Sequence, residues 1–285
     1  MLRAYLKLTK PGVMLGNLIT TIAGFLFAAD GKINLLLFAA TVIGTALVIS
    51  SACVINNYLD QDIDSKMERT KNRPLISGDV NSAAALVFGI GLGIVGLVII
   101  ILWSNWWVAG VGALGFVTYV WLYGVLGKRK SVHGTLVGSL SGAAPILAGY
   151  VAVNPGIDLT AVILFLILFF WQMPEFYSIS IYRKKEYAAA GVPVSSVVRG
   201  VATTKLHIYI YTLLTVASIL ALALMPLAST MYFIIMLLVS LYWLKVAFEG
   251  ISTKNDNVWS KRNFQASLVV LVVFSVFISI NSYLP

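Results

Sequence analysis

The chain has 285 residues, of which 59% are hydrophobic and only 11% are charged, and its mean hydropathy is +0.91. A water-soluble domain cannot bury that much apolar surface, so the composition excludes a fully soluble protein and indicates one that lies partly in lipid. The formal net charge is +9. Because the basic residues gather on one side of the predicted spans, we attribute this charge to membrane orientation and not to nucleic-acid binding.

Nine apolar segments are long enough to cross a membrane. Their apolar runs are continuous and do not alternate with polar residues, which favours helices over the strands of a barrel. We therefore expect a single all-α membrane domain over residues 1–285. The predicted spans are 12–29, 34–55, 82–103, 106–126, 134–153, 159–179, 206–225, 230–248 and 264–284.

The connections between these spans differ in charge. With the N-terminus in the cytoplasm and the C-terminus outside, all of the 20 Lys and Arg residues except Lys32 fall on the cytoplasmic side, as the positive-inside rule requires. We expect the first span to be retained, because no small-residue cleavage site follows a short apolar core. The single cysteine, Cys53, excludes internal disulfides. The predicted cytoplasmic segments are 56–81, 127–133, 180–205 and 249–263.

Residues 56–74, NNYLDQDIDSKMERTKNRP, directly follow the second span. The four-residue spacing of Asn56, Asp60 and Asp64 predicts three oxygen-bearing side chains on one helical face at the cytoplasmic boundary. A carboxylate immersed in the membrane costs about 2–3 kcal/mol, so these groups need a partner cation.

Three interpretations of this segment compete. A solvated loop explains the charges but not their regular spacing. A calcium loop begins correctly at Asp60, but Ser65 stands in place of the turn glycine and Lys71 in place of the bidentate glutamate. A magnesium site completed by substrate phosphate fits best, because Mg²⁺ takes one or two carboxylates plus phosphate oxygens. The basic residues that follow could hold the phosphate: Lys66, Arg69, Lys71 and Arg73.

A second polar cluster lies in WQMPEFYSISIYRKKEYAAAGVP, at the end of the sixth span. Glu175, Tyr182 and Glu186 are spaced by seven and four residues, which predicts one shared helical face if Pro174 kinks the helix only above them. Carboxylates for a metal ion beside guanidinium groups for phosphate, as in residues 56–74, are the arrangement of a diphosphate site. Glu186 would then hold a second magnesium ion against the same diphosphate. The alternative is a boundary helix with interfacial aromatic residues and extended Lys and Arg side chains.

These segments resemble UbiA-type intramembrane prenyltransferases, in whose first aspartate-rich motif an Asn and two Asp recur at four-residue steps. Within that superfamily the chain is similar to the branch that farnesylates haem. Glu175 stands where that branch commonly has His, and Tyr182 and Glu186 stand where quinone-type members carry paired aspartates. The similarity rests on LTKPGVMLGNLIT, NNYLDQDIDSKMERTKNRPL, KRKSVHGTLVGSLSGAAPILAGY and WQMPEFYSISIYRKKEYAAAGVPV.

The resemblance implies a bundle of about nine transmembrane helices in a bacterial-type inner membrane, with a central cavity open toward the cytoplasm. It also implies transfer of the farnesyl group of farnesyl diphosphate to protoheme IX, with Mg²⁺ as cofactor, haem as substrate and lipids around the chain. A homo-oligomer and a partner in haem A synthesis stay open. Another acceptor, a quinone precursor or a chlorophyll-like ring, is the close alternative. A secondary transporter is disfavoured, because acidic residues are nearly absent from the middle of the spans.

The expected site residues follow from the same resemblance. The expected metal ligands are Asn56, Asp60, Asp64 and Glu186. The expected catalytic residues are Asp60, Asp64, Glu186 and Tyr182. The expected substrate-binding residues are Asn57, Arg69, Lys71, Arg73, Tyr123, Lys128, Arg183, His133 and Glu175. Trp171 and Tyr177 are aromatic candidates for stabilising a carbocation.

Overall fold

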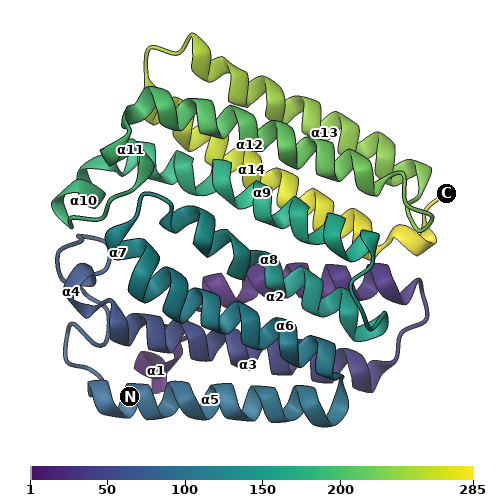
Figure 1. Cartoon of the computed structure of the whole chain (residues 1–285), viewed down its shortest axis with the longest axis horizontal. Coiled ribbons are helices and arrows are strands. Elements are labelled where there is room, and N and C mark those ends of the chain that lie inside the picture. The colour runs from purple at the N-terminus through teal and green to yellow at the C-terminus, as the bar shows by residue number, and fades with distance from the viewer. Residues whose placement is uncertain (1) are drawn as a thin grey trace.

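The protein is described here by a computed structural model that covers residues 2–285. Its long helices run roughly along one common direction (Figure 1). Within the described residues, nine helices are long and apolar enough to cross a membrane, which confirms the predicted number of spans. They are α2 (Pro11–Ala29), α3 (Leu35–Leu59), α5 (Ser82–Trp103), α6 (Trp106–Val117) with its continuation to Lys130, α8 (Gly134–Val153), α9 (Leu159–Tyr182), α12 (Gly200–Leu222), α13 (Thr230–Phe248) and α14 (Asp256–Ser279).

The fourth span is not a regular α-helix throughout. After α6 the chain continues as a π-helical segment, Thr118–Gly127, and then as one short α-helical turn, α7 (Lys128–Lys130). A π-helix this long is rare, and such segments are frequent at functional sites. This segment ends at the same end of the bundle as the longer connections (Figure 1).

The short helices gather at that end of the bundle, and the C-terminus lies at the opposite end (Figure 1). Two further short segments, Glu249–Ile251 and Asn281–Tyr283, are 3₁₀-helical. The long connections therefore bring segments far apart in the sequence to one face of the bundle. The short helices there are α1 (Leu2–Leu8), α4 (Gln61–Asp64), α10 (Lys184–Ala189) and α11 (Ser195–Val198).

Several spans extend beyond the apolar segments that predict them. The helix α3 continues to Leu59, α12 begins at Gly200 and α14 begins at Asp256. Polar residues supply these extra turns and their caps. The side chain of Asn255, for example, accepts a hydrogen bond from the backbone N–H of Val258 at 3.1 Å. Hydropathy alone therefore underestimates the helices at their charged ends.

Small residues allow the spans to approach closely. A Cβ placed on Gly149 of α8 would overlap the carbonyl oxygen of Thr21 in α2, and one placed on Gly24 would overlap that of Ile146. In the same way, a Cβ on Gly96 of α5 would lie 2.8 Å from the carbonyl oxygen of Gly44 in α3. Close backbone contact of this kind replaces the hydrophobic driving force that lipid removes.

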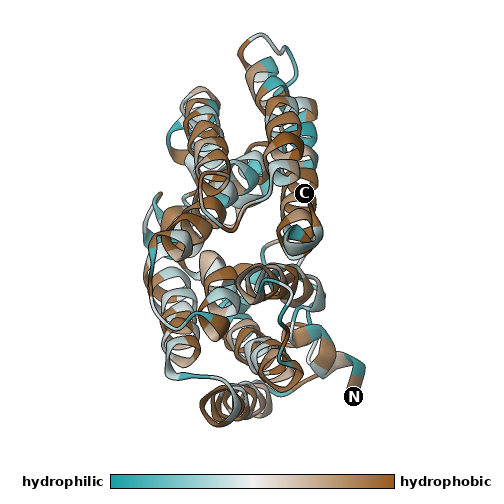
Figure 2. Cartoon of the chain, turned by 90° about the vertical axis from the view of Figure 1, so that its right-hand side faces the viewer, coloured by the Kyte–Doolittle hydropathy of each residue, from teal (hydrophilic) through white to brown (hydrophobic). Residues whose placement is uncertain are grey.

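The outer surface of the bundle is apolar. Hydrophobic residues dominate the helices (Figure 2), and many large ones are exposed, including Leu102, Leu114 and Leu238. Such a surface is stable where lipid replaces water. The polar side chains of a reactive site would therefore lie inside the bundle or at its ends.

Candidate active site

A cavity of about 360 Å³ lies between α2, α3, α6, α8 and α9. Its walls are mostly apolar, but one end carries charge. Among the described residues, the cavity is lined by four cationic side chains and two carboxylates, which leaves an excess of two positive charges. These residues are Lys10, Arg69, Arg73, Lys128, Asp60 and Asp64.

The first acidic motif keeps its spacing although the helix does not run straight through it. The helix α3 ends at Leu59, Asp60 caps it, and α4 follows at once. The N–H of Asp60 donates to the carbonyl of Asn56 at 3.0 Å, and the N–H of Asp64 donates to that of Asp60 at 2.8 Å. Asn56, Asp60 and Asp64 therefore all line the cavity, as the spacing predicts, and they are at most 3% exposed.

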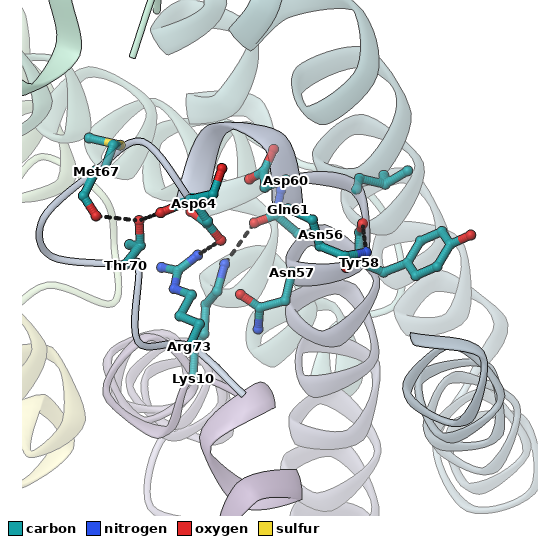
Figure 3. A network of polar contacts seen from close by, with 12 residues as sticks. Lys10, Asn56, Asn57, Tyr58, Asp60, Gln61, Asp64, Met67, Thr70 and Arg73 are labelled. Atoms are coloured by element: carbon teal, nitrogen blue, oxygen red, sulfur yellow. Dashed lines mark hydrogen bonds and ion pairs between the residues drawn. The ribbon is translucent and has the colours of Figure 1, made fainter. Parts of the chain in front are cut away.

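Each of these three side chains is held by a cation. The ammonium of Lys10 donates to Asn56 Oδ1 at 2.7 Å, and that of Lys128 donates to Asp60 Oδ2 at 2.6 Å. The guanidinium of Arg73 pairs with the carboxylate of Asp64. Figure 3 shows Lys10 and Arg73 reaching up side by side toward Asn56 and Asp64. Cations from three different parts of the chain thus hold this cluster, and two of them, Lys128 and Arg73, neutralise the buried carboxylates.

The hydrogen bonding of this cluster is incomplete. Asp60 Oδ1 and Asn56 Nδ2 are buried and have no hydrogen-bond partner within residues 2–285. A buried carboxylate oxygen without a partner is costly, so it is a natural place for a cation to bind. Two carboxylates and an amide oxygen are hard ligands of the kind Mg²⁺ prefers.

The donor set is nevertheless too small to hold a metal ion alone. Across the part of the chain that the structure describes, no group of three or more His, Cys, Asp or Glu side chains is placed to bind one ion. The residues present fit a magnesium ion whose other ligands come from phosphate and water.

Lys10 is a cavity residue that sequence analysis missed. It precedes Pro11, the first residue of α2, and has a left-handed backbone with φ of 49°. From this turn its side chain reaches Asn56 and lines the cavity. Burial lowers the pKa of the Lys10 ammonium to about 8. A lysine directly before a proline that begins a span was the available signal.

The π-helical segment provides the aromatic wall beside Asn56. The rings of Tyr119 and Tyr123 stack with their centroids 5.7 Å apart, and both line the cavity. The hydroxyl of Tyr119 lies 3.4 Å from Asn56 Oδ1. The backbone N–H of Lys128 donates to the carbonyl of Tyr123, so the wider turn places Lys128 next to Asp60.

Arg129, a neighbour of Lys128, was also missed by sequence analysis. Its guanidinium donates to both carboxylate oxygens of Asp62 and to the carbonyl of Leu59, at 2.5–2.7 Å. These hydrogen bonds lower the pKa of Asp62 to about 2. Arg129 therefore ties the end of α3 to the end of the fourth span.

The expected substrate-binding residues divide into two groups. Arg69, Arg73, Tyr123 and Lys128 line the cavity. Asn57 does not, because its buried side chain donates to the carbonyl of Leu8 at 2.8 Å and so fixes the segment before Lys10. Lys71 is also outside the cavity, paired with exposed Glu68 at 2.6 Å. His133 is exposed, with Nε2 3.0 Å from the guanidinium of Arg199.

The second polar cluster does not form the predicted shared face. The helix α9 ends at Tyr182, and Glu186 belongs to the separate helix α10, because Arg183 interrupts the helical path. Glu186 pairs with Arg183 at 3.0 Å, and neither residue is among those that line the cavity. The expectation that Glu186 shares the cavity with Asp60 is therefore not met in this structure. Its neighbour Tyr187 lines the cavity instead.

Tyr182 and Glu175 also lie outside the cavity lining. The ring of Tyr182 packs edge-on against Phe264 and lies under the guanidinium of Arg183. Glu175 is half-buried on α9, between Pro174, which the helix accommodates without ending, and Phe176, which lines the cavity. Neither side chain is therefore part of the cavity wall.

Aromatic residues line the cavity, but Trp171 and Tyr177, the two that the sequence suggested for stabilising a carbocation, are not among them. Trp171 donates from Nε1 to the carbonyl of Ser267 at 2.8 Å, and the ring of Tyr177 lies 5.7 Å from that of His207. Neither is part of the lining. The aromatic side chains that do face the cavity are Phe116, Tyr119, Tyr123, Phe176 and Tyr187.

Comparison with known proteins agrees with this arrangement. The UbiA prenyltransferase family matches residues 17–269. Protoheme IX farnesyltransferase of Edwardsiella ictaluri is 46% identical over 281 residues, which is 99% of this chain and 95% of that protein. Protoheme IX farnesyltransferase of Serratia proteamaculans is 45% identical with the same coverage.

Solved structures share the fold at low identity. A structure of digeranylgeranylglyceryl phosphate synthase has a TM-score of 0.83 at 18% identity, covering 99% of this chain and 98% of that one. A UbiA homologue from Archaeoglobus fulgidus, bound to GPP and Mg²⁺, has a TM-score of 0.73 at 17% identity, covering 97% and 99%. Family match, full-length relatives and shared fold lead to one conclusion. The chain belongs to the UbiA prenyltransferase family.

Proposed function

We propose that this protein transfers the farnesyl group of farnesyl diphosphate to a vinyl side chain of protoheme IX, giving haem O and diphosphate. The observation that carries this proposal is the cavity, apolar along most of its walls and charged at one end by the acidic motif and its cations. The relatives named protoheme IX farnesyltransferase, similar over the full chain, support haem as the acceptor.

The charged end of the cavity is the proposed diphosphate subsite. Arg69, Arg73 and Lys128 line it, and Lys10 faces it from the start of α2. Arginine binds phosphate through two parallel N–H groups, whereas lysine acts as a point charge. Together these groups neutralise the negative charge that develops on the leaving diphosphate.

Asn56, Asp60 and Asp64 are the proposed magnesium ligands, with the diphosphate supplying further oxygens. When bound, Mg²⁺ polarises the diphosphate oxygens and makes diphosphate a better leaving group. A UbiA homologue bound to GPP and Mg²⁺ supports a magnesium requirement in the family. Glu186 stays a proposed ligand for a second magnesium ion. This role requires that Arg183 leave Glu186 and pair with the diphosphate instead.

The cavity walls account for the second half of the reaction. Heterolysis of the allylic C–O bond leaves a farnesyl cation, which aromatic faces such as Tyr119, Tyr123 and Phe176 stabilise and from which the apolar walls exclude water. The terminal carbon of the haem vinyl group attacks this cation. Water then adds to the resulting cation beside the porphyrin and loses a proton, which gives the hydroxyethylfarnesyl side chain.

We propose that the charged end of the bundle faces the cytoplasm, with the N-terminus inside and the C-terminus outside an inner membrane of bacterial type. All Lys and Arg residues except Lys32 lie in or beside the connections at this end, and the positive-inside rule then sets the orientation. The diphosphate subsite would accordingly receive its substrate from the cytoplasmic side.

The direct test of the acceptor is a panel experiment. Purified protein is incubated with farnesyl diphosphate and Mg²⁺, and with haem b, a quinone precursor or a chlorophyll-like ring, and the products are identified by mass spectrometry. We expect haem O from haem b and no prenylated product from the other acceptors. Prenylation of a quinone precursor but not of haem would assign the protein to another branch of the family.

A further inference from the structure

We propose that this cavity binds the prenyl diphosphate first and the divalent cation only with it, because Lys10, Lys128 and Arg73 occupy the metal ligands until diphosphate draws them away. The inference rests on the proposed function, since it concerns the same substrate and the same site. It adds an order of binding and gives Lys10 a role in it.

The first observation is that every proposed metal ligand already has a cationic partner. Lys10 holds Asn56 at 2.7 Å and Lys128 holds Asp60 at 2.6 Å, and Arg73 pairs with Asp64. A metal ion that arrives alone must displace these three partners, which would then stay partly buried near it without an anion. Removing one partner of a buried ion pair in this way is strongly unfavourable.

The second observation is the charge of the cavity lining. Four cationic side chains face two carboxylates, so the empty lining already has an excess of two positive charges. A divalent cation alone would raise that excess to four. A prenyl diphosphate, which carries about three negative charges near neutral pH, would instead offset it and offer the lysines and arginines new partners.

The third observation is a buried carboxylate oxygen that has no hydrogen-bond partner among the described residues. Asp60 Oδ1 is buried without a hydrogen-bond partner, and Arg129 approaches it only to 3.7 Å. This oxygen is ready to bind a cation as soon as the surrounding positive charge is balanced. Diphosphate binding would therefore create the metal site, and by linkage the metal would strengthen diphosphate binding by the same factor.

The experiment measures each ligand with and without the other, in protein purified in lipid nanodiscs. Mn²⁺ serves as the metal probe, followed by its electron paramagnetic resonance signal, and farnesyl S-thiolodiphosphate serves as the unreactive anion. The analogue is also titrated calorimetrically in EDTA. The complex of Mn²⁺ with the analogue in solution is measured in parallel without protein.

We expect the analogue to bind in EDTA, and Mn²⁺ to bind about 100-fold more weakly alone than with the analogue. Lys10→Met should tighten the binding of Mn²⁺ alone about tenfold and weaken the analogue in EDTA by a similar factor. Lys128→Met tests the same exchange at Asp60 if Lys10→Met does not fold. Lys254→Met is the matched control, because Lys254 is exposed and does not line the cavity.

Equal affinity for Mn²⁺ with and without the analogue, or no binding of the analogue in EDTA, would overturn the proposed order. Haem O formation by the same preparation separates this result from the proposed function. If haem O forms while Mn²⁺ binds tightly alone, only the order is wrong. If binding follows the proposed order but no haem O forms, only the proposed acceptor chemistry is wrong.

Discussion

The ammonium of Lys128 lies 2.6 Å from Asp60 Oδ2, although the two residues are 68 positions apart in the chain. Lys128 follows the π-helical end of the fourth span, and Asp60 caps the second span. Their contact joins two connections at the charged end of the bundle into one site. It also shows that the acidic motif is built to be balanced by cations from elsewhere in the chain.

Two adjacent asparagines are expected to differ in function. Asn56 lines the cavity, whereas Asn57 donates to the carbonyl of Leu8. Asn56→Ala should lower turnover and leave the melting temperature nearly unchanged. Asn57→Ala should lower the free energy of unfolding by about 1–3 kcal/mol, because it leaves a buried carbonyl without its donor. Thermal unfolding and haem O formation, measured on both variants, check this. A loss of stability in Asn56→Ala alone would reverse the assignment.

Arg73 is expected to bind diphosphate through the geometry of its guanidinium. Arg73→Lys keeps the charge near Asp64 but loses the paired N–H groups, so the KM for farnesyl diphosphate should rise about tenfold. Initial rates at varied farnesyl diphosphate check this. Arg262→Lys is the matched control, because Arg262 pairs with Glu249 outside the cavity. An unchanged KM in Arg73→Lys would place Arg73 outside the diphosphate subsite.

Close packing of α2 against α8 is expected to limit side-chain size at Gly149. Gly149→Ala brings a methyl group onto the backbone carbonyl of Thr21, so it should destabilise the bundle by about 1–3 kcal/mol. Gly91→Ala on α5 meets nothing within 4 Å and should be neutral or slightly stabilising. Thermal unfolding in detergent compares the two. Equal melting temperatures would show that α2 and α8 separate at little cost.

Much of the fold was predictable from sequence, because span length and continuous hydropathy are set locally. The four-residue spacing of Asn56, Asp60 and Asp64 also survived, since backbone hydrogen bonds carry it across the junction of α3 and α4. The number of spans was confirmed, and so was the family resemblance.

The remaining parts of the site depend on helix breaks and turns, which the spacing of residues in the sequence does not encode. A helix break at Arg183 moved Glu186 out of the predicted face. The left-handed turn at Lys10 and the π-helical segment before Lys128 brought two distant lysines to the acidic motif. These tertiary contacts decide which cation meets which carboxylate, and the sequence spacing does not encode them. For this reason Asn57 and Lys71 were predicted as site residues, although neither lines the cavity.

The measurement that tests this account most directly is haem O formation by wild-type protein and by Asp60→Asn, with farnesyl diphosphate, haem b and Mg²⁺. Asp60→Asn removes the charge of a carboxylate between Lys128 and the cavity, so turnover should fall at least about 100-fold while the protein still inserts and folds. Glu68→Gln, an exposed carboxylate outside the cavity, should keep wild-type activity. Haem O production at the wild-type rate in folded Asp60→Asn would contradict the account.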